Sequence, residues 1–335
     1  MSISFTKLLW LLLVIAAGLF CLSLMLPDGL AAPKAPASFL LAELLSDNAD
    51  IARIIFLELR LPRASLALVM GASLGLAGAA MQGLLQNPLA EPGVVGVSGS
   101  AALGATLAFY SGLSTVMPLT LPLGGILGAL IAVALLFMIA GKRASTATML
   151  LAGIAINAIA GALTALVLNL SPNPFAAMEI IFWQMGSLAD RSFLHLQLAG
   201  PLMVAGWGLI FLAGPATRAL SLGEVTATSL GINVRGAQTK IIVGTALCVG
   251  AGVAVTGVIG FIGLVVPHLL RRICNHDPAQ LMLASAGGGA CLLLAADIAV
   301  RCIPASTELK LGVITALVGA PFFLYLIFQL RKLEQ

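Results

Sequence analysis

Side chains that could do chemistry are sparse in this sequence, and most of them lie in two motifs rich in glycine and proline. The first motif runs from Gln82 to Gly93, and the second runs from Gly257 to Arg271. Their notable positions are Asn87 and Pro88 in the first motif, and Gly257, Gly263, Pro267 and His268 in the second. Neither motif sets a nucleophile beside a base or repeats metal ligands at a coordinating spacing, so no catalytic centre or resident metal is predicted.

Charged residues form a second group, near the ends of apolar segments. Asp297 precedes Arg301 by four residues, a helical spacing that favours a local ion pair. Arg60 and Arg63 flank Leu61 and Pro62, where arginines either snorkel to a membrane surface or contact a partner. For His268 we favour a structural hydrogen bond over contact with a substrate.

The elements that carry these residues are predicted to be membrane helices. The chain has 335 residues, of which 60% are hydrophobic and 9% charged, and its mean hydropathy is +1.10. A soluble domain could not cover so much apolar surface, and the short alternating segments of a membrane barrel are not visible. About ten segments are long enough to cross a bilayer, the first being a retained helix rather than a cleaved signal. They lie near 8–26, 63–82, 93–110, 118–140, 146–169, 196–214, 240–257, 258–274, 281–301 and 311–330.

A repeated pattern relates the two halves of the chain. Gly71, Gly78 and Pro88 recur as Gly250, Gly257 and Pro267, each 179 positions later. The copies begin at the second and seventh helices, an odd separation that predicts an inverted repeat of helices 2–5 and 7–10. We therefore expect an all-α, polytopic membrane protein with one transmembrane domain over residues 1–335 and both termini in the cytoplasm.

Two segments outside this helical framework have local signals of their own. Residues 222–234 read as a short helix ended by Gly231, followed by a second short helix capped by Asn233. Ser145 or Thr146 is expected to cap the fifth membrane helix. The sequence has no GxxxxGK[ST] loop, so ATP hydrolysis would belong to a partner and this chain is predicted not to be an enzyme.

Five motifs in order resemble the permease family of type II ABC importers for iron-siderophores, haem and cobalamin. They are Arg60-Leu-Pro-Arg63, the stretch from Gln82 to Gly93, Trp183-Gln-Met-Gly186-Ser187, the stretch from Gly257 to Arg271, and Asp297-Ile-Ala-Val-Arg301. The resemblance implies a ten-helix subunit that works as a homodimer in the bacterial inner membrane. It also implies two cytoplasmic ATPase subunits, which bind the ATP, and a periplasmic substrate-binding protein. Lipid is the expected surrounding, no cofactor is expected in this chain, and no nucleic acid is an expected partner.

The resemblance assigns roles to individual residues. The coupling element that seats in the ATPase matches Gly223, Glu224, Ala227, Leu230 and Gly231, where the alternative is an ordinary exposed turn. Thr146 and Ala147 match the cytoplasmic gate of the pathway, although Ala147 lacks the hydroxyl group found in some relatives. Arg60, Arg63 and Arg301 match arginines that dock the binding protein, and Trp183 to Ser187 matches a short helix at the substrate vestibule.

Two further function classes share features with an import permease. An ion-coupled transporter shares inverted repeats but usually needs acidic or histidine relays within the bilayer, and the acidic residues here lie mostly outside the apolar segments. A membrane enzyme lacks convergent catalytic groups. Among import substrates, the stretches 147–158 and 182–188 most resemble the haem branch, with a ferric siderophore or cobalamin as the alternative.

Overall fold

The computed structural model describes residues 4–26, 53–113, 117, 119–141, 146–171, 173–303 and 309–333. Within these ranges the chain is helical, and ten apolar helices follow the order that the sequence predicted. These ten are α1 (Phe5–Met25), α4 (Leu61–Leu85), α5 (Val97–Tyr110), α7 (Thr120–Ala140), α8 (Thr146–Asn169), α10 (Phe193–Leu212), α13 (Val234–Thr256), α14 (Ile262–Arg271), α15 (Pro278–Cys302) and α16 (Leu311–Leu333). Shorter helical pieces connect them: the π-helical turn η1 (Ile55–Arg60), the 3₁₀ turn η2 (Pro92–Val95), α9 (Pro174–Gln184), α11 (Gly214–Leu220) and α12 (Glu224–Ser229).

Seven of the described helices are long and apolar enough to cross a membrane, and three apolar helices are shorter. The shorter helices are Val97–Tyr110, Ile262–Arg271 and the apolar part of α16, Leu311–Leu326. The all-helical polytopic fold is therefore confirmed. The span expected at 258–274 is corrected, because the chain leaves helical geometry from Gly257 to Phe261 and α14 begins only at Ile262.

This break distinguishes the two copies of the repeat. Gly257 and Phe261 both have left-handed backbones, with φ of 73° and 67°. Their counterparts 179 positions earlier are Gly78 and Gln82, which lie inside the uninterrupted helix α4. Glycine adopts positive φ at little cost, whereas a bulky residue such as Phe261 does so rarely. The corresponding stretch is thus continuous in the first half and unwound in the second.

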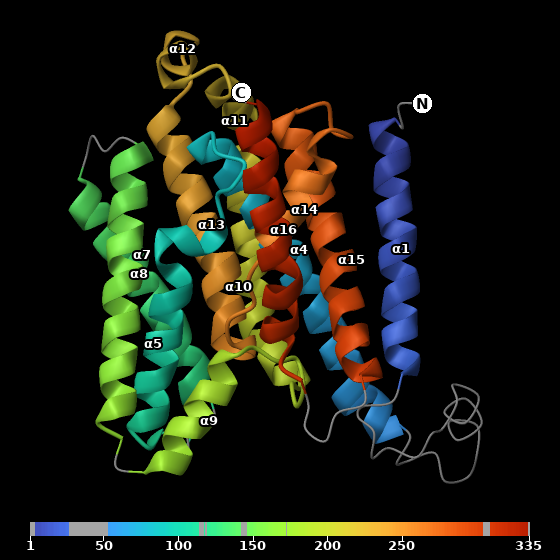
Figure 1. Cartoon of the computed structure of the whole chain (residues 1–335), viewed down its shortest axis with the longest axis vertical. Coiled ribbons are helices and arrows are strands. Elements are labelled where there is room, and N and C mark those ends of the chain that lie inside the picture. The colour runs from blue at the N-terminus through green and yellow to red at the C-terminus, as the bar shows by residue number, and fades with distance from the viewer. Residues whose placement is uncertain are drawn as a thin grey trace.

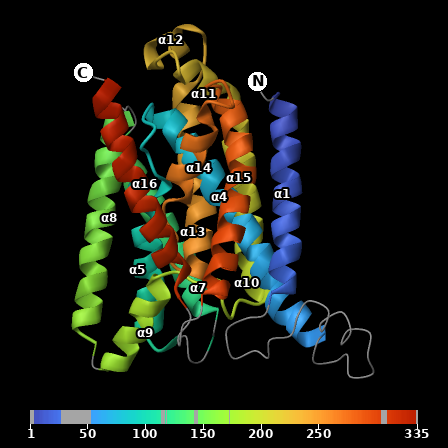
Figure 2. The same cartoon turned by 45° about the vertical axis from the view of Figure 1, so that its right-hand side comes forward.

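The two copies run in opposite directions. In Figure 1, α4 rises from the lower end of the molecule, whereas α13 descends from the upper end. The beginning of α1 and the end of α16 lie at the same end, which also carries α12 (Figures 1 and 2). This arrangement agrees with the predicted inverted repeat and with two termini on one side.

Small residues bring the central helices together. α4 packs mainly against α15 and also contacts α13 and α14. A Cβ atom added at Gly78 would clash with the backbone of Gly263, and one added at Gly71 would clash with that of Gly289. Close backbone approach through small residues is the usual packing of membrane helices, where water exclusion gives little driving force.

Large apolar side chains cover the outer helices. Exposed examples occur on α1 (Trp10), α7 (Leu127), α8 (Leu151) and α16 (Leu317). Water-soluble proteins rarely expose contiguous apolar surface on this scale. The outer surface therefore suits lipid or another membrane-embedded subunit.

Candidate functional site

α12 and the turn after it form a compact projection at the end of the molecule that carries both termini (Figure 1). The helix begins after Gly223, which has φ of 97°, and ends at Ser229, followed by the cap residue Leu230 and by Gly231 with φ of 78°. The Ile232 N–H donates to the Ala227 carbonyl at 3.1 Å, which closes the turn over the buried Ala227 side chain. The predicted short helix and its glycine terminator are confirmed.

Asn233 caps the next helix, as its residue type predicts, but that helix is not short. Its side-chain oxygen accepts a hydrogen bond from the Gly236 N–H at 2.8 Å. The capped element is α13, which continues through the apolar sequence to Thr256. The second short helix of the prediction is therefore the first turn of a membrane-length helix.

The outer surface of this projection is apolar. Val225 is 83% exposed and Leu230 is 62% exposed, and Leu222 beside them is also exposed. Such side chains at an exposed turn are typical of a surface that another protein covers.

An ion pair ties α11, the helix before α12, to the start of α15. Arg218 in α11 donates from Nε to both carboxylate oxygens of Asp277, at 3.0 and 3.1 Å. Asp277 also caps α15 by accepting the N–H groups of Ala279 and Gln280. Partial burial acts to raise the pKa of Asp277, but the hydrogen bonds from Arg218 and the two N–H groups outweigh it and lower the pKa. The carboxylate therefore stays charged and ties α11 to α15.

The predicted gate and the predicted coupling element meet directly. The Thr146 hydroxyl, at the first residue of α8, donates to the Glu224 carboxylate at the first residue of α12. Gln238 of α13 donates from its amide to Thr146 Oγ1 at 3.3 Å and to Glu224 Oε1 at 3.4 Å. Gln238 is buried and was missed by the sequence analysis, although a polar residue early in an otherwise apolar helix is a usable signal. Ala147 is exposed beside this cluster, and the predicted cap Ser145 lies outside the described residues.

The two glycine- and proline-rich motifs bind one another. Glu91, from the first motif, accepts the Phe261 N–H of the second at 2.8 Å. Gln82 donates to the Gly263 and Leu264 carbonyls at 3.3 and 3.4 Å. Both motifs are visible in the amino-acid composition, whereas their contact is visible only in the structure.

Inside these motifs the named residues have local roles. Asn87 follows the end of α4 and accepts the Leu89 N–H at 2.9 Å through its side chain, which closes the turn that contains Pro88. Pro267 lies within α14. The His268 ring packs edge-on against Phe322 with 5.8 Å between ring centroids, and its Nδ1 has no hydrogen-bond partner among the described residues. The hydrogen bond expected for His268 is therefore not seen at Nδ1.

Two cavities border the unwound segment between α13 and α14, and Val258 lines both. One has a volume of about 530 Å³ and includes Glu91, Ser98 and Asn157 in its lining. The other has a volume of about 550 Å³ and lies along Gln184 and α16.

The short helix α9, expected from Trp183 to Ser187, is anchored to the same segment. The Ser187 N–H donates to the Thr256 carbonyl at 2.8 Å, and the Val258 N–H donates to the Gln184 carbonyl at 3.2 Å. Gly186 turns the chain between them with φ of 76°. α9 begins earlier than expected, at Pro174, and ends at Gln184.

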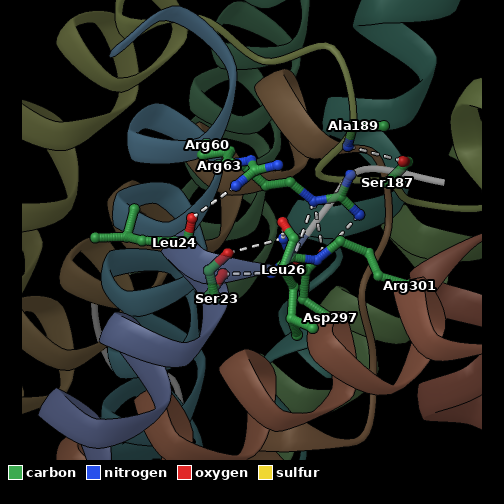
Figure 3. Close-up of polar contacts among 9 residues, drawn as sticks. All are labelled: Ser23, Leu24, Leu26, Arg60, Arg63, Ser187, Ala189, Asp297 and Arg301. Carbon is green, nitrogen blue, oxygen red and sulfur yellow. Dashed lines mark hydrogen bonds and ion pairs between the residues drawn. The ribbon is translucent and has the colours of Figure 1, made fainter. Parts of the chain in front are cut away.

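At the opposite end of the molecule, three arginines surround the end of α1. Arg63 and Arg301 both pair with Asp297, at 2.9 and 3.1 Å, and Asp297 is only 1% exposed. Arg301 also donates to the Ser23 carbonyl at 2.9 Å, and Arg60 donates to the Leu24 carbonyl at 3.1 Å. Figure 3 shows these side chains converging between α1, the start of α4 and the end of α15. The predicted Asp297–Arg301 pair is confirmed, and Arg63 joins it from 234 residues away.

The sequence pattern of the FecCD transport family matches residues 11–329. This chain belongs to the FecCD transport family. This chain is 40% identical over 288 residues to the hemin transport system permease protein HmuU of Yersinia pestis. The alignment covers 83% of this chain and 84% of HmuU. This chain is also 42% identical over 274 residues to the vitamin B12 import system permease protein BtuC of Vibrio cholerae, an alignment that covers 81% of each chain.

Solved structures agree with this assignment. One, described as an inward-facing conformation of a metal-chelate type ABC transporter, is similar with a TM-score of 0.84 and 28% identity, covering 97% of this chain and 99% of that one. PsaBC from Streptococcus pneumoniae has a TM-score of 0.54 at 17% identity, which shows a shared fold alone. The FecCD chain is accordingly a multi-pass transmembrane permease subunit of an ABC transporter, not the ATPase, and subunits of this kind carry no cofactor.

Proposed function

We propose that this permease forms, with a second copy of itself, the pathway of an ATP-driven type II importer in the bacterial inner membrane. Two ATPase subunits would bind at the cytoplasmic end, and a periplasmic binding protein would deliver the substrate at the other. One observation carries the proposal. The apolar projection at Val225 and Leu230 sits on a short helix whose first residue, Glu224, is hydrogen-bonded to the start of α8. A partner that moves α12 would therefore act on a membrane helix.

Haem is the substrate that we favour. Support comes from the residues of α8 and α9 that resemble the haem branch, and from the 40% identity to a permease named for hemin transport. Cobalamin is the second candidate, because a permease named for vitamin B12 import is 42% identical. A ferric siderophore is the third member of the same chemical group.

The proposed pathway runs between α8 and α16 of the two copies. Both helices expose large apolar side chains, among them Ile154 of α8, which also lines the cavity beside Glu91. Together with the polar groups Ser98, Asn157 and Gln184, this lining suits a large, mainly apolar chelate.

Uptake into proteoliposomes tests the proposal. The permease is reconstituted with its cognate ATPase and binding protein, and uptake of haem, cobalamin and a ferric siderophore is compared with and without ATP. We expect ATP-dependent accumulation, with haem fastest by at least about tenfold, which is about 1.4 kcal/mol of discrimination. Faster uptake of cobalamin would replace the substrate assignment, and uptake driven by an ion gradient without the ATPase would refute an ATP-driven importer.

Docking of the binding protein by Arg60, Arg63 and Arg301 stays a prediction. Arg60 and Arg63 are each 6% exposed, so direct docking requires these side chains to leave their buried positions. Substituting Arg63 or Arg301 would break an ion pair of Asp297, whereas substituting Arg60 removes neither pair. Arg60 therefore gives the cleaner test.

We expect Arg60→Ala to weaken association with the binding protein by about three- to tenfold at low salt, and by less at high salt, because salt screens the attraction between a partner carboxylate and an arginine that has turned out to the surface. Binding of the labelled binding protein to nanodisc-embedded permease measures this. Arg53→Ala is the matched control, since Arg53 is an exposed arginine at the same end. Equal affinities of the two variants at low salt would reject a docking role for Arg60.

A further inference from the structure

We infer that Gln238 is a positioning residue that links movement of α12 to the start of α8, an inference that rests on the proposed transport function. Gln238 contacts both Thr146, which matches the cytoplasmic gate, and Glu224, which matches the coupling element. Its amide donates to Thr146 Oγ1 at 3.3 Å and to Glu224 Oε1 at 3.4 Å, and Thr146 itself donates to Glu224. The three side chains come from α8, α12 and α13, and they close a triangle of hydrogen bonds.

The triangle joins α8 to α12 and α13, helices with which α8 otherwise makes little direct contact. α8 packs mainly against α5, α7 and η2, whereas α13 packs mainly against α10, α7 and α4. α12 is attached to α13 through the turn at Ala227 and through the cap at Asn233. α12 and the first turns of α13 thus form one unit, and Thr146 is a point where α8 is hydrogen-bonded to it.

Burial limits the hydrogen-bond partners that the Gln238 amide can choose. Gln238 is 4% exposed, and Thr146 and Gln238 border a space lined by the apolar side chains of Leu136, Met149 and Ile242. An amide in such surroundings has few alternative partners, and leaving it without a hydrogen bond is costly. The amide therefore holds Glu224 and Thr146 in one arrangement, and a displacement of Glu224 must pull on Thr146 or break both bonds.

Donors and acceptors in the triangle have fixed roles. The Glu224 carboxylate only accepts hydrogen bonds, whereas the Gln238 amide nitrogen and the Thr146 hydroxyl donate to it. Changing Gln238 to leucine removes the donor, and changing it to glutamate places a second carboxylate against Glu224. Exchanging the two residues, as Glu224→Gln with Gln238→Glu, restores one carboxylate and one amide.

The test measures uptake per ATP hydrolysed by the complete transporter in proteoliposomes, using whichever of haem, cobalamin and a ferric siderophore the wild-type complex takes up fastest. We expect Gln238→Leu and Gln238→Glu each to lower this ratio at least fivefold, and the exchanged double variant to recover at least half of the wild-type ratio. Gln280→Leu is the matched control and should keep the wild-type ratio. This control makes the same glutamine-to-leucine change at the same end of the molecule, but on α15. There the Gln280 backbone N–H donates to Asp277, a contact that the substitution leaves in place.

Several outcomes separate this inference from the function on which it rests. A wild-type complex that fails to transport refutes the proposed function. A transporting wild type together with a Gln238→Leu variant within twofold of its ratio overturns the inference alone. A double variant whose ratio is no better than that of Gln238→Glu alone overturns the pairing of Gln238 with Glu224. Yield and elution of each complex on size exclusion confirm that the compared variants are folded and assembled.

Discussion

Replacing Asp297 with alanine is expected to destabilise the folded permease by about 3–5 kcal/mol, because removing one member of a buried charge group leaves the others uncompensated. Arg63 and Arg301 both pair with this carboxylate, and all three side chains are buried. The loss would also weaken the contact with α1, since Asp297 helps to position Arg301, which donates to the Ser23 carbonyl near the end of that helix. Thermal unfolding in detergent, followed by circular dichroism, measures the change.

Asp277→Ala is the control for this prediction. Asp277 also pairs with an arginine and caps a helix, but Arg218 is well exposed, so the substitution should cost only about 1–2 kcal/mol. A second variant asks whether charge or volume matters: Asp297→Asn keeps the shape and an acceptor but loses the charge, and it should fall between wild type and Asp297→Ala. Equal melting temperatures for Asp297→Ala and Asp277→Ala would contradict the prediction.

The double variant Val225→Asp/Leu230→Asp is expected to weaken binding of the ATPase subunit by about 100-fold or more. Burying a valine or leucine side chain contributes about 1.5–3 kcal/mol, and each 1.4 kcal/mol changes affinity tenfold. Both side chains are exposed on the α12 projection in the isolated subunit. Titration of the purified ATPase onto nanodisc-embedded permease gives the affinity, and uptake should fall in parallel.

Phe175→Asp provides the comparison for the α12 variant. Phe175 is an equally exposed apolar residue on α9, at the opposite end of the molecule (Figure 1). Its substitution should leave ATPase affinity unchanged, which excludes a general effect of added charge on the reconstituted subunit. Wild-type affinity in the Val225/Leu230 double variant would show that the ATPase binds elsewhere.

Local signals accounted for much of the fold. Apolar runs located the ten helices, Gly231 marked the end of α12, and the four-residue spacing of Asp297 and Arg301 predicted their ion pair. In each case the residues that interact are neighbours in sequence or along one helix. Their geometry is therefore fixed by helix periodicity and backbone preference before any tertiary packing.

The contacts that define the candidate site needed the tertiary structure. Arg63 joins Asp297 from another helix, and Gln238 lies 92 positions from Thr146. Glu91 meets Phe261 across 170 positions. A repeat offset says which residues correspond, not which residues touch. The sequence placed a boundary between two spans at residues 257 and 258, but it did not predict the unwound stretch from Gly257 to Phe261, because the glycines there are as compatible with tight helix packing as with an unwound backbone.

The unwound segment from Gly257 to Phe261 has a consequence for how each half of the subunit can deform. A continuous helix resists bending because its successive backbone hydrogen bonds must stretch together, and α4 retains those bonds through residues 78–82. Residues 257–261 lie outside any helix, so torsional rotation there does not strain such a ladder. Two halves that share one sequence pattern therefore differ in what resists rotation at this point, a helical ladder in the first and hydrogen bonds to Gln184 and Glu91 in the second.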